Sequence, residues 1–383
     1  MAVTTAAETD DLLAAARSLA ELIESEAGAS EGLGTLSEAV VQAFRDRGLL
    51  SMLVPRELGG GEAGVVTALE VIEEVTRADA STGWTLLANA STSAMAGSYL
   101  GERAVEAMFG ARRPVTHAGQ FAPRGHAWPT EHGYVVAGSY SFGSGSGHAE
   151  WIGGGTLELR DGAPALVDGR PVIRAFFVPR DKVVFRGGWD VMGLVGTGSY
   201  DYDVPEQEVD ADFTFSITDP VARRGGPFYH LGVLGITSLA HAGFAMGAGK
   251  RALQEVIALA GTKQRMGQPA TVATQERFQY DLGHHDAATT AARAGIIEAF
   301  TDAEHTLQQG AELSAVQAQR LRQCTTYATH VARDVVRFAY HWAGTDSLRP
   351  GVLQRLFRDT HAATQHIFVD DSTLTQMGRL LLG

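Results

Sequence analysis

Two histidines near the end of the chain offer the clearest acid–base chemistry in the sequence. His361 and His366 follow an Arg358-Asp359 pair, within a run that is otherwise apolar or small. Histidine titrates near neutral pH, so His366 could take a proton from a substrate or donate a hydrogen bond to a reacting oxygen. The two are five residues apart, or about 140° around a helix. Because they share no face, we expect no metal site and assign His361 to packing.

A second candidate is Ser144, which lies between Gly143 and Gly145. A serine hydroxyl can donate or accept a hydrogen bond without adding charge, and flanking glycines allow close approach to the backbone. The alternative is a turn serine without a chemical role, just as the alternative for His366 is a core histidine with satisfied hydrogen bonds.

Other catalytic and cofactor motifs are absent. The chain has no His-Glu-x-x-His and no paired cysteines. It also shows no nicotinamide-binding glycine fingerprint that follows a strand pattern and opens a helix. The segment 243–251 has the wrong spacing for a phosphate loop, so we expect it to be a small-residue face for tight helix packing.

The elements that position these residues change character twice along the chain. Apolar residues recur at helical spacing from residue 6 to about 112, and β-branched and aromatic runs follow to about 215. Helical periodicity then returns over 231–262, 270–308, 311–343 and 350–380. We therefore predict an α+β fold with a helical domain at 1–113, a central β-barrel or sandwich at 114–216, and a C-terminal four-helix bundle at 217–383.

Composition excludes several classes of protein. The net charge of −13 over 383 residues argues against a nucleic-acid partner. The single cysteine, Cys324, excludes an internal disulfide and fits a reducing compartment. The acidic N-terminus does not resemble a signal peptide, and no uninterrupted apolar run reaches the ~18 residues of a membrane span. We expect a cytoplasmic protein without a membrane partner.

Five separate stretches occur in the order that the acyl-CoA dehydrogenase superfamily shows. Each is weak alone, but together, inside a helix–β–helix layout, they resemble that superfamily across nearly the whole chain. The stretches are Val54-Pro55 with Gly59-Gly60, 133–145, Gly193 to Ser199, Arg265 to Pro269, and Gly344 to Asp359.

A histidine seven residues after the Arg358-Asp359 pair narrows the resemblance. True dehydrogenases carry a carboxylate base at about Ile367 and Phe368, whereas this chain has His366 beside them. The chain thus looks like the two-component (group D) flavin-dependent monooxygenases, which are aromatic hydroxylases and heteroatom oxygenases.

This resemblance implies a reduced flavin, FMNH2 or FADH2, between the β domain and the bundle. Dioxygen adds to it to form a C4a-hydroperoxyflavin, the oxygen donor. His366 then corresponds to the active-site acid/base and Ser144 to the contact with flavin N5. The matching positions for flavin binding are Gln120, Phe142, Gly143, Gly145, Thr197, Arg265, Gln275, Gly344 and Thr345.

The resemblance also implies partners. A separate NAD(P)H:flavin reductase supplies the reduced flavin, the substrate is a small aromatic molecule, and the oxygenase is a homotetramer. In such tetramers Arg265 and Gln275 reach the flavin phosphate or adenylate across a subunit boundary.

The sequence departs from the monooxygenase pattern at two places. Tyr140 stands where many hydroxylases have tryptophan, and the helix after Trp84 has Asn89 but no histidine. This leaves N- or S-oxygenation open. An acyl-CoA dehydrogenase-like oxidoreductase is a further alternative, although Asp370 and Asp371 come too late to act as its base. A non-catalytic scaffold that kept the fold is the last alternative.

Overall fold

The N-terminal third of the protein is helical, as predicted. The computed structural model describes residues 6–110, 115–187 and 189–383. The predicted boundary at 113/114 lies outside these residues. Two short 3-10 helices, η1 (Leu49–Ser51) and η2 (Arg56–Leu58), interrupt this region. Its helices are α1 (Ala6–Ser18), α2 (Ala20–Leu33), α3 (Glu38–Asp46), α4 (Val65–Ala78), α5 (Ala80–Tyr99) and α6 (Glu102–Phe109).

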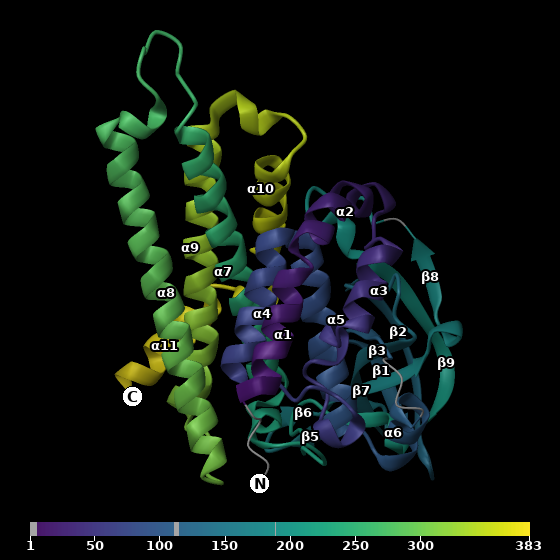
Figure 1. Cartoon of the computed structure of the whole chain (residues 1–383). Helices are drawn as coiled ribbons and strands as arrows, with labels where there is room; N and C mark the ends of the chain where they lie inside the picture. The colour runs from purple at the N-terminus through teal and green to yellow at the C-terminus, as the bar shows by residue number, and fades with distance from the viewer. Residues whose placement is uncertain (1–5, 111–114, 188) are drawn as a thin grey trace.

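Helix α5 lies between the sheet and the bundle and is buried along almost its whole length (Figure 1). Asp79 starts it, because its carboxylate accepts hydrogen bonds from the backbone N–H of Thr82 at 2.9 Å and from the Thr82 hydroxyl at 2.8 Å. A helix enclosed on all sides cannot be amphipathic. The polar side chains that α5 carries, Trp84 and Asn89 among them, therefore face other parts of the protein.

The central domain is built on a mixed sheet in the order β10-β7-β3-β1-β2-β9-β8. Strands β1 and β3 run parallel and the other neighbours antiparallel. The β-branched and aromatic runs of the sequence form β2, β7 and β9. Strand β1 was not recognised, because Pro123 and Gly125 interrupt its pattern at the positions where its register shifts. The strands are β1 (His117–Pro129), β2 (Gly133–Gly143), β3 (Trp151–Arg160), β7 (Ile173–Pro179), β8 (Val184–Gly187), β9 (Tyr200–Asp210) and β10 (Thr214–Ser216), with two-residue strands β4 (Ala163–Pro164), β5 (Leu166–Val167) and β6 (Arg170–Pro171).

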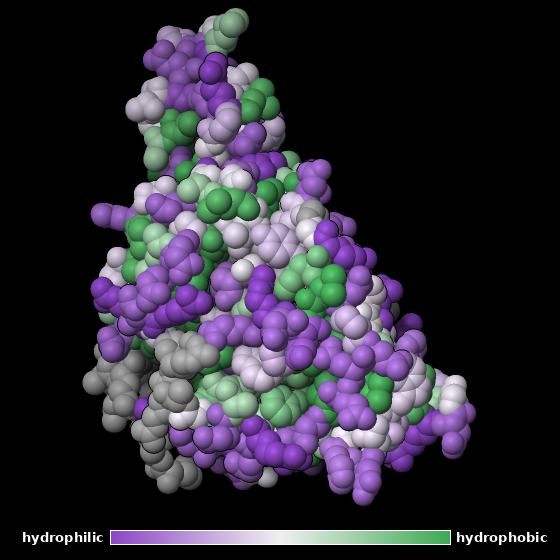
Figure 2. Space-filling model, turned by 90° about the vertical axis from the view of Figure 1, so that its right-hand side faces the viewer, coloured by the Kyte–Doolittle hydropathy of each residue, from purple (hydrophilic) through white to green (hydrophobic). Residues whose placement is uncertain are grey.

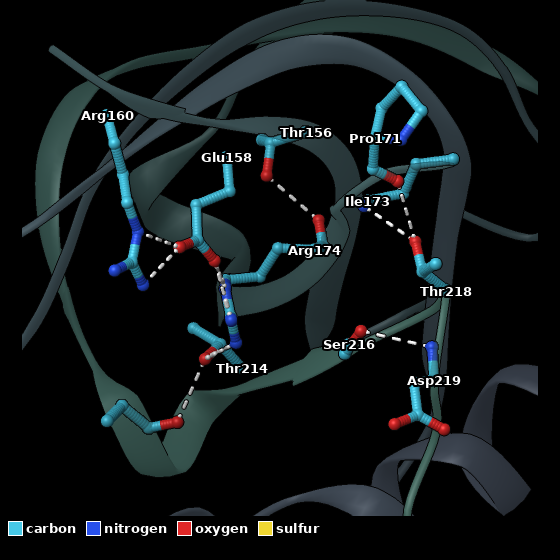
Figure 3. A network of polar contacts seen from close by, with 11 residues as sticks. Thr156, Glu158, Arg160, Pro171, Ile173, Arg174, Thr214, Ser216, Thr218 and Asp219 are labelled. Carbon is cyan, nitrogen blue, oxygen red and sulfur yellow. Dashed lines mark hydrogen bonds and ion pairs between the residues drawn. The ribbon is translucent and has the colours of Figure 1, made fainter. Parts of the chain in front are cut away.

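A buried carboxylate fastens one end of this sheet (Figure 3). Glu158 on β3 is 2% exposed and forms ion pairs with Arg160 at 2.8 Å and with Arg174 on β7 at 2.7 Å. The Arg174 guanidinium also lies 4.1 Å from the centre of the Tyr134 ring on β2. Both partners of Glu158 are cations, so this acid has a structural role in the sheet.

The C-terminal region is helical, but its last predicted helix, 350–380, is wrong as a single element. The chain leaves α10 at Ala363, forms the 3-10 turn η9 (Ile367–Val369) and re-enters a helix at Ser372. Side chains cause the break. The Thr364 hydroxyl donates to the His361 carbonyl at 2.6 Å, which competes with the backbone for that acceptor. The helices are α7 (Gly232–Ala260), α8 (Glu276–Gln308), α9 (Ala315–Ala343), α10 (Val352–Ala363) and α11 (Ser372–Leu382).

Helix α7 packs tightly against α4 through the small-residue face predicted in 243–251. A Cβ on Gly243 would lie 2.9 Å from the Leu69 carbonyl oxygen, and one on Gly247 would collide with the backbone at Glu73. Contrary to the expectation from apolar runs, Pro227–Ala260 has the length and hydropathy of a membrane span, but 83% of its apolar window is buried inside the protein. Helix α7 is a core helix that packs against α4, α5 and α9.

Candidate functional site

The turn after β2 places Ser144 beside α5. Gly145 has φ +73, and a Cβ there would collide with the Asn89 amide. The same amide donates to the His117 carbonyl at 2.8 Å and accepts from His148 Nε2 at 2.9 Å. Asn89, noted in the sequence only for not being histidine, thus holds the turn against β1.

Ser144 is part of a line of polar groups, which we call the hydroxyl chain. Trp84 Nε1 donates to Ser144 Oγ at 3.0 Å, and Ser144 Oγ lies 2.8 Å from Ser199 Oγ. Ser199 Oγ lies 2.6 Å from Thr197 Oγ1, which donates to the Leu194 carbonyl at 2.7 Å. Two predicted site residues, Ser144 and Thr197, are therefore joined through Ser199, which the sequence reasoning did not select.

His366 also contacts Trp84. The two ring centres are 5.5 Å apart in an edge-on arrangement. A second histidine, His241 on α7, lies 4.4 Å from His366 and 5.0 Å from Trp84. Phe244 and Phe368 pack against Trp84 and the histidines, so the pair sits among aromatic rings.

The histidine pair, His241 and His366, is neutral at pH 7. Burial lowers the pKa of His366 to about 4. Burial, and then the neighbouring His366, lower the pKa of His241 well below its usual value. His366 Nδ1 accepts from the Phe368 N–H at 3.4 Å. Among the described residues we find no hydrogen-bond partner for His366 Nε2 or for the His241 ring, so these nitrogens are available to a ligand.

His241 was missed in the sequence, although a signal exists. It is the one titratable residue in the first part of α7, from Gly232 to Gly249, where the other residues are small, apolar or hydroxyl-bearing. A titratable residue in such a helix must either be satisfied inside the core or face a cavity. The sequence alone did not place α7 against residue 366, because the break after Ala363 was not predicted.

The Arg358-Asp359 pair proves to be a clamp. Asp359 is 3% exposed and accepts from the Leu194 N–H at 2.6 Å and from the Ser81 hydroxyl at 3.0 Å. Arg358 donates to the Met192 carbonyl at 3.2 Å. At Gly193 a Cβ would collide with the Arg358 backbone. The pair therefore fixes the 192–199 segment, and with it the end of the hydroxyl chain, to α10.

His361 lies away from the ring cluster. Its Nδ1 hydrogen-bonds the Phe357 carbonyl at 2.7 Å, and its ring lies 4.1 Å from the Phe357 ring within α10. These contacts agree with the expectation that His361 is a packing residue.

No carboxylate takes the place that a dehydrogenase base would need, as far as the described residues show. Ile367 is 73% exposed, and Phe368 stacks on His366 at 5.3 Å. The two following acids are engaged elsewhere. Asp370 accepts from the Ser372 N–H at 2.9 Å, and Asp371 pairs with His330 at 3.0 Å.

Two other predicted flavin residues lie on the sheet near the Ser144 turn. Phe142 has φ +67 and is 64% exposed, with its ring 5.9 Å from Trp189. A left-handed backbone at an exposed phenylalanine is strained, which is typical of ligand sites. Gln120 donates its backbone N–H to the Tyr202 hydroxyl at 3.0 Å, so this N–H already has a partner.

The four remaining flavin candidates cluster at the far end of the bundle. Arg265 stacks on Trp342 at 4.4 Å, Gln275 bonds Gln268 at 2.7 Å, and Gly344 ends α9 with φ +58, followed by the exposed Thr345. The connection that carries Arg265 projects at the top of Figure 1 and remains the highest part in Figure 2. Within one described chain, none of the four contacts Ser144 or His366.

Several known proteins are similar to this chain in sequence. Residues 7–109 match the family "Acyl-CoA dehydrogenase, N-terminal domain" and residues 239–371 match "Acyl-CoA dehydrogenase, C-terminal domain". The indole-3-acetate monooxygenase of Acinetobacter baumannii is 28% identical over 361 residues, which cover 93% of this chain and 90% of that protein. The oxygenase component of an FADH2-dependent resorcinol hydroxylase from a Rhizobium species is 27% identical over 395 residues, covering 95% and 92%.

The fold agrees with these matches. The crystal structure of the 3-HSA hydroxylase from Rhodococcus sp. RHA1 superposes with a TM-score of 0.89, at 23% identity over 97% of each chain. Together the two matched families cover more than half of the sequence. The chain therefore belongs to the acyl-CoA dehydrogenase superfamily, within its flavin-dependent monooxygenase branch.

Proposed function

We propose that the protein is the oxygenase component of a two-component flavin-dependent monooxygenase, which uses reduced flavin and O2 to hydroxylate an aromatic or heteroaromatic small molecule. One observation carries this proposal. Trp84 joins the two predicted catalytic residues, because its N–H donates to Ser144 at 3.0 Å and its ring lies against His366 at 5.5 Å. The relatives named above act on indole-3-acetate and resorcinol, both aromatic.

The residues around Ser144 fit a flavin. The strained, exposed Phe142 offers an apolar surface for a flat ring. Ser144 itself is partly exposed. When bound, a reduced flavin would supply the activation of dioxygen. The structure does not distinguish FMN from FAD, so the proposal covers both.

The histidine pair serves the substrate. Because His366 Nδ1 accepts the Phe368 N–H, the Nε2 of the neutral ring carries the hydrogen and can donate a hydrogen bond to a substrate or reacting oxygen. The aromatic rings around the pair keep water from the reacting atoms. No lysine or arginine among the described residues contacts these rings, so a neutral substrate face suits this part of the site.

We further propose that the protein works as a cytoplasmic homotetramer supplied by a separate NAD(P)H:flavin reductase. The connection between α7 and α8, which carries Arg265, lies at the top of Figure 1, and none of Arg265, Gln275, Gly344 and Thr345 contacts Ser144 within one described chain. A second subunit that presents this cluster to the flavin phosphate would give it a function. Arginine suits that role because its planar guanidinium pairs with phosphate oxygens.

Product analysis tests the function. The purified protein, a flavin reductase and NADH are incubated with a panel of phenols, indoles and amines, and products are identified by mass spectrometry. We expect one added oxygen atom in at least one aromatic compound, only when reduced flavin is supplied. Bleaching of a tightly bound oxidised FAD by an acyl-CoA, with no oxygenated product, would overturn the proposal in favour of a dehydrogenase.

Replacing His241 tests its share in substrate handling. We expect His241→Phe, which keeps a flat ring but removes both nitrogens, to lower product formed per flavin oxidised about tenfold, the effect of one lost hydrogen bond. His241→Asn keeps a hydrogen-bonding group and should recover part of the yield. Unchanged product yield in His241→Phe would show that this residue only fills space.

A further inference from the structure

The hydroxyl chain has a fixed direction, which follows from counting its hydrogens. The Leu194 carbonyl can only accept, so the Thr197 hydroxyl must donate to it at 2.7 Å. The Thr197 hydrogen is then used, and at 2.6 Å Ser199 must donate to Thr197. The Ser199 hydrogen is used in turn, and at 2.8 Å Ser144 must donate to Ser199.

The Trp84 end of the hydroxyl chain agrees with this direction. The Trp84 indole can only donate, and it gives its N–H to Ser144 Oγ at 3.0 Å. Ser144 therefore donates its one hydrogen to Ser199 and accepts one from Trp84. A single lone pair remains on Ser144 Oγ, so toward a ligand this serine can accept a hydrogen bond but cannot donate one.

We propose that Ser199 and Thr197 are positioning residues that commit the Ser144 hydrogen and thereby make Ser144 an acceptor-only contact for the flavin. This inference rests on the proposed flavin site, with ring nitrogen N5 toward Ser144. In reduced flavin N5 carries a hydrogen, which Ser144 can accept. In oxidised flavin N5 is a bare acceptor, and two acceptors facing each other leave both without a hydrogen.

The hydroxyl chain thus selects the redox state of the flavin through hydrogen-bond polarity, without any charged group. The Ser144 turn is firmly tied to the same segment, because the Gly145 N–H donates to the Thr197 carbonyl at 2.9 Å. Ser144 consequently has little freedom to turn toward another acceptor.

The test measures binding of both flavin forms to the full-length protein. Reduced FMN is titrated anaerobically and oxidised FMN aerobically, each followed by flavin fluorescence or absorbance, and the ratio of the two Kd values is compared between variants. FAD is titrated in the same way. We expect Ser199→Ala to narrow the preference for reduced flavin about tenfold, since the freed Ser144 hydrogen can now be donated to a bare nitrogen.

Two further variants make the result specific. Thr197→Val should narrow the ratio of the two Kd values in the same direction. Ser199 then loses the Thr197 acceptor and can donate its hydrogen to Ser144, which frees the Ser144 hydrogen for the flavin. Ser146→Ala removes a buried hydroxyl in the same turn that bonds the Gly198 carbonyl at 3.1 Å, outside the hydroxyl chain, and should leave the ratio as in the wild type.

The outcomes separate the two proposals. If the wild type binds flavin but Ser199→Ala and Thr197→Val keep its Kd ratio, the hydroxyl chain does not set the polarity and the inference is wrong. An equal change in Ser146→Ala would also overturn it, since the effect would then be general loosening of the turn. If the wild type binds neither flavin form, the proposed function itself fails.

Discussion

The His366→Ala variant should stop making oxygenated product while it continues to oxidise reduced flavin and release hydrogen peroxide. The imidazole that hydrogen-bonds the substrate or reacting oxygen is lost, whereas the hydrogen bond between Trp84 and Ser144 is untouched. General acid–base groups contribute about 10²–10⁴-fold in rate, so product formation should fall by that factor. Product is measured by chromatography and peroxide by a coupled peroxidase assay.

His361→Ala is the matched control, because this histidine lies on the same segment but bonds only its own helix. It should keep the ratio of product to peroxide. Hydroxylation retained in His366→Ala would remove His366 from the mechanism. Loss of flavin oxidation in the same variant would point instead to a collapsed site.

The free energy of unfolding of the Asp359→Asn variant, compared with the wild type, should change with pH in the opposite sense from most acid-to-amide changes. Burial and then the nearby Asp79 carboxylate raise the pKa of Asp359 from 3.8 to about 7. The folded protein therefore holds this proton longer than the unfolded chain does. The resulting stabilisation is fully present below pH 3.8 and is lost as the pH rises through about 7.

Asparagine resembles the protonated acid, since its oxygen can accept the Leu194 N–H and its amide can donate to Ser81. The wild type should lose about 3 kcal/mol of stability relative to Asp359→Asn between pH 5 and pH 8. Urea unfolding at both pH values measures this difference. The exposed Asp219→Asn serves as control, and a difference that stays constant with pH would contradict the prediction.

The layout of the fold could be predicted because its signals are local. Apolar residues at helical spacing predict the N-terminal helices and the long bundle helices, and β-branched and aromatic runs predict β2, β7 and β9. Strand β1 was not predicted, because Pro123 and Gly125 interrupt the pattern of a strand. The sheet accommodates both residues through register shifts. The break after Ala363 escaped because no glycine or proline marks it.

The site could be predicted only in part, for a related reason. Ser144 and His366 were identified through short motifs, and in the structure both contact Trp84. His241 and Ser199 carry no motif, and their proximity arises from packing between segments distant in sequence. The flavin roles assigned to Arg265, Gln275, Gly344 and Thr345 stay predictions, because one chain does not bring them to Ser144.

The clamp at Asp359 has a consequence for how the protein is made. Its hydrogen bonds to Leu194 and Ser81 join positions 165 and 278 residues apart. Contacts at such separation close long loops, whose entropy cost the folded protein must offset. The docking of α10 orders the 192–199 segment, and the segment that follows α10 carries His366 to Trp84. Molecules that have not finished folding then lack a complete active site, so catalytic activity itself reports that the whole chain has reached its final structure.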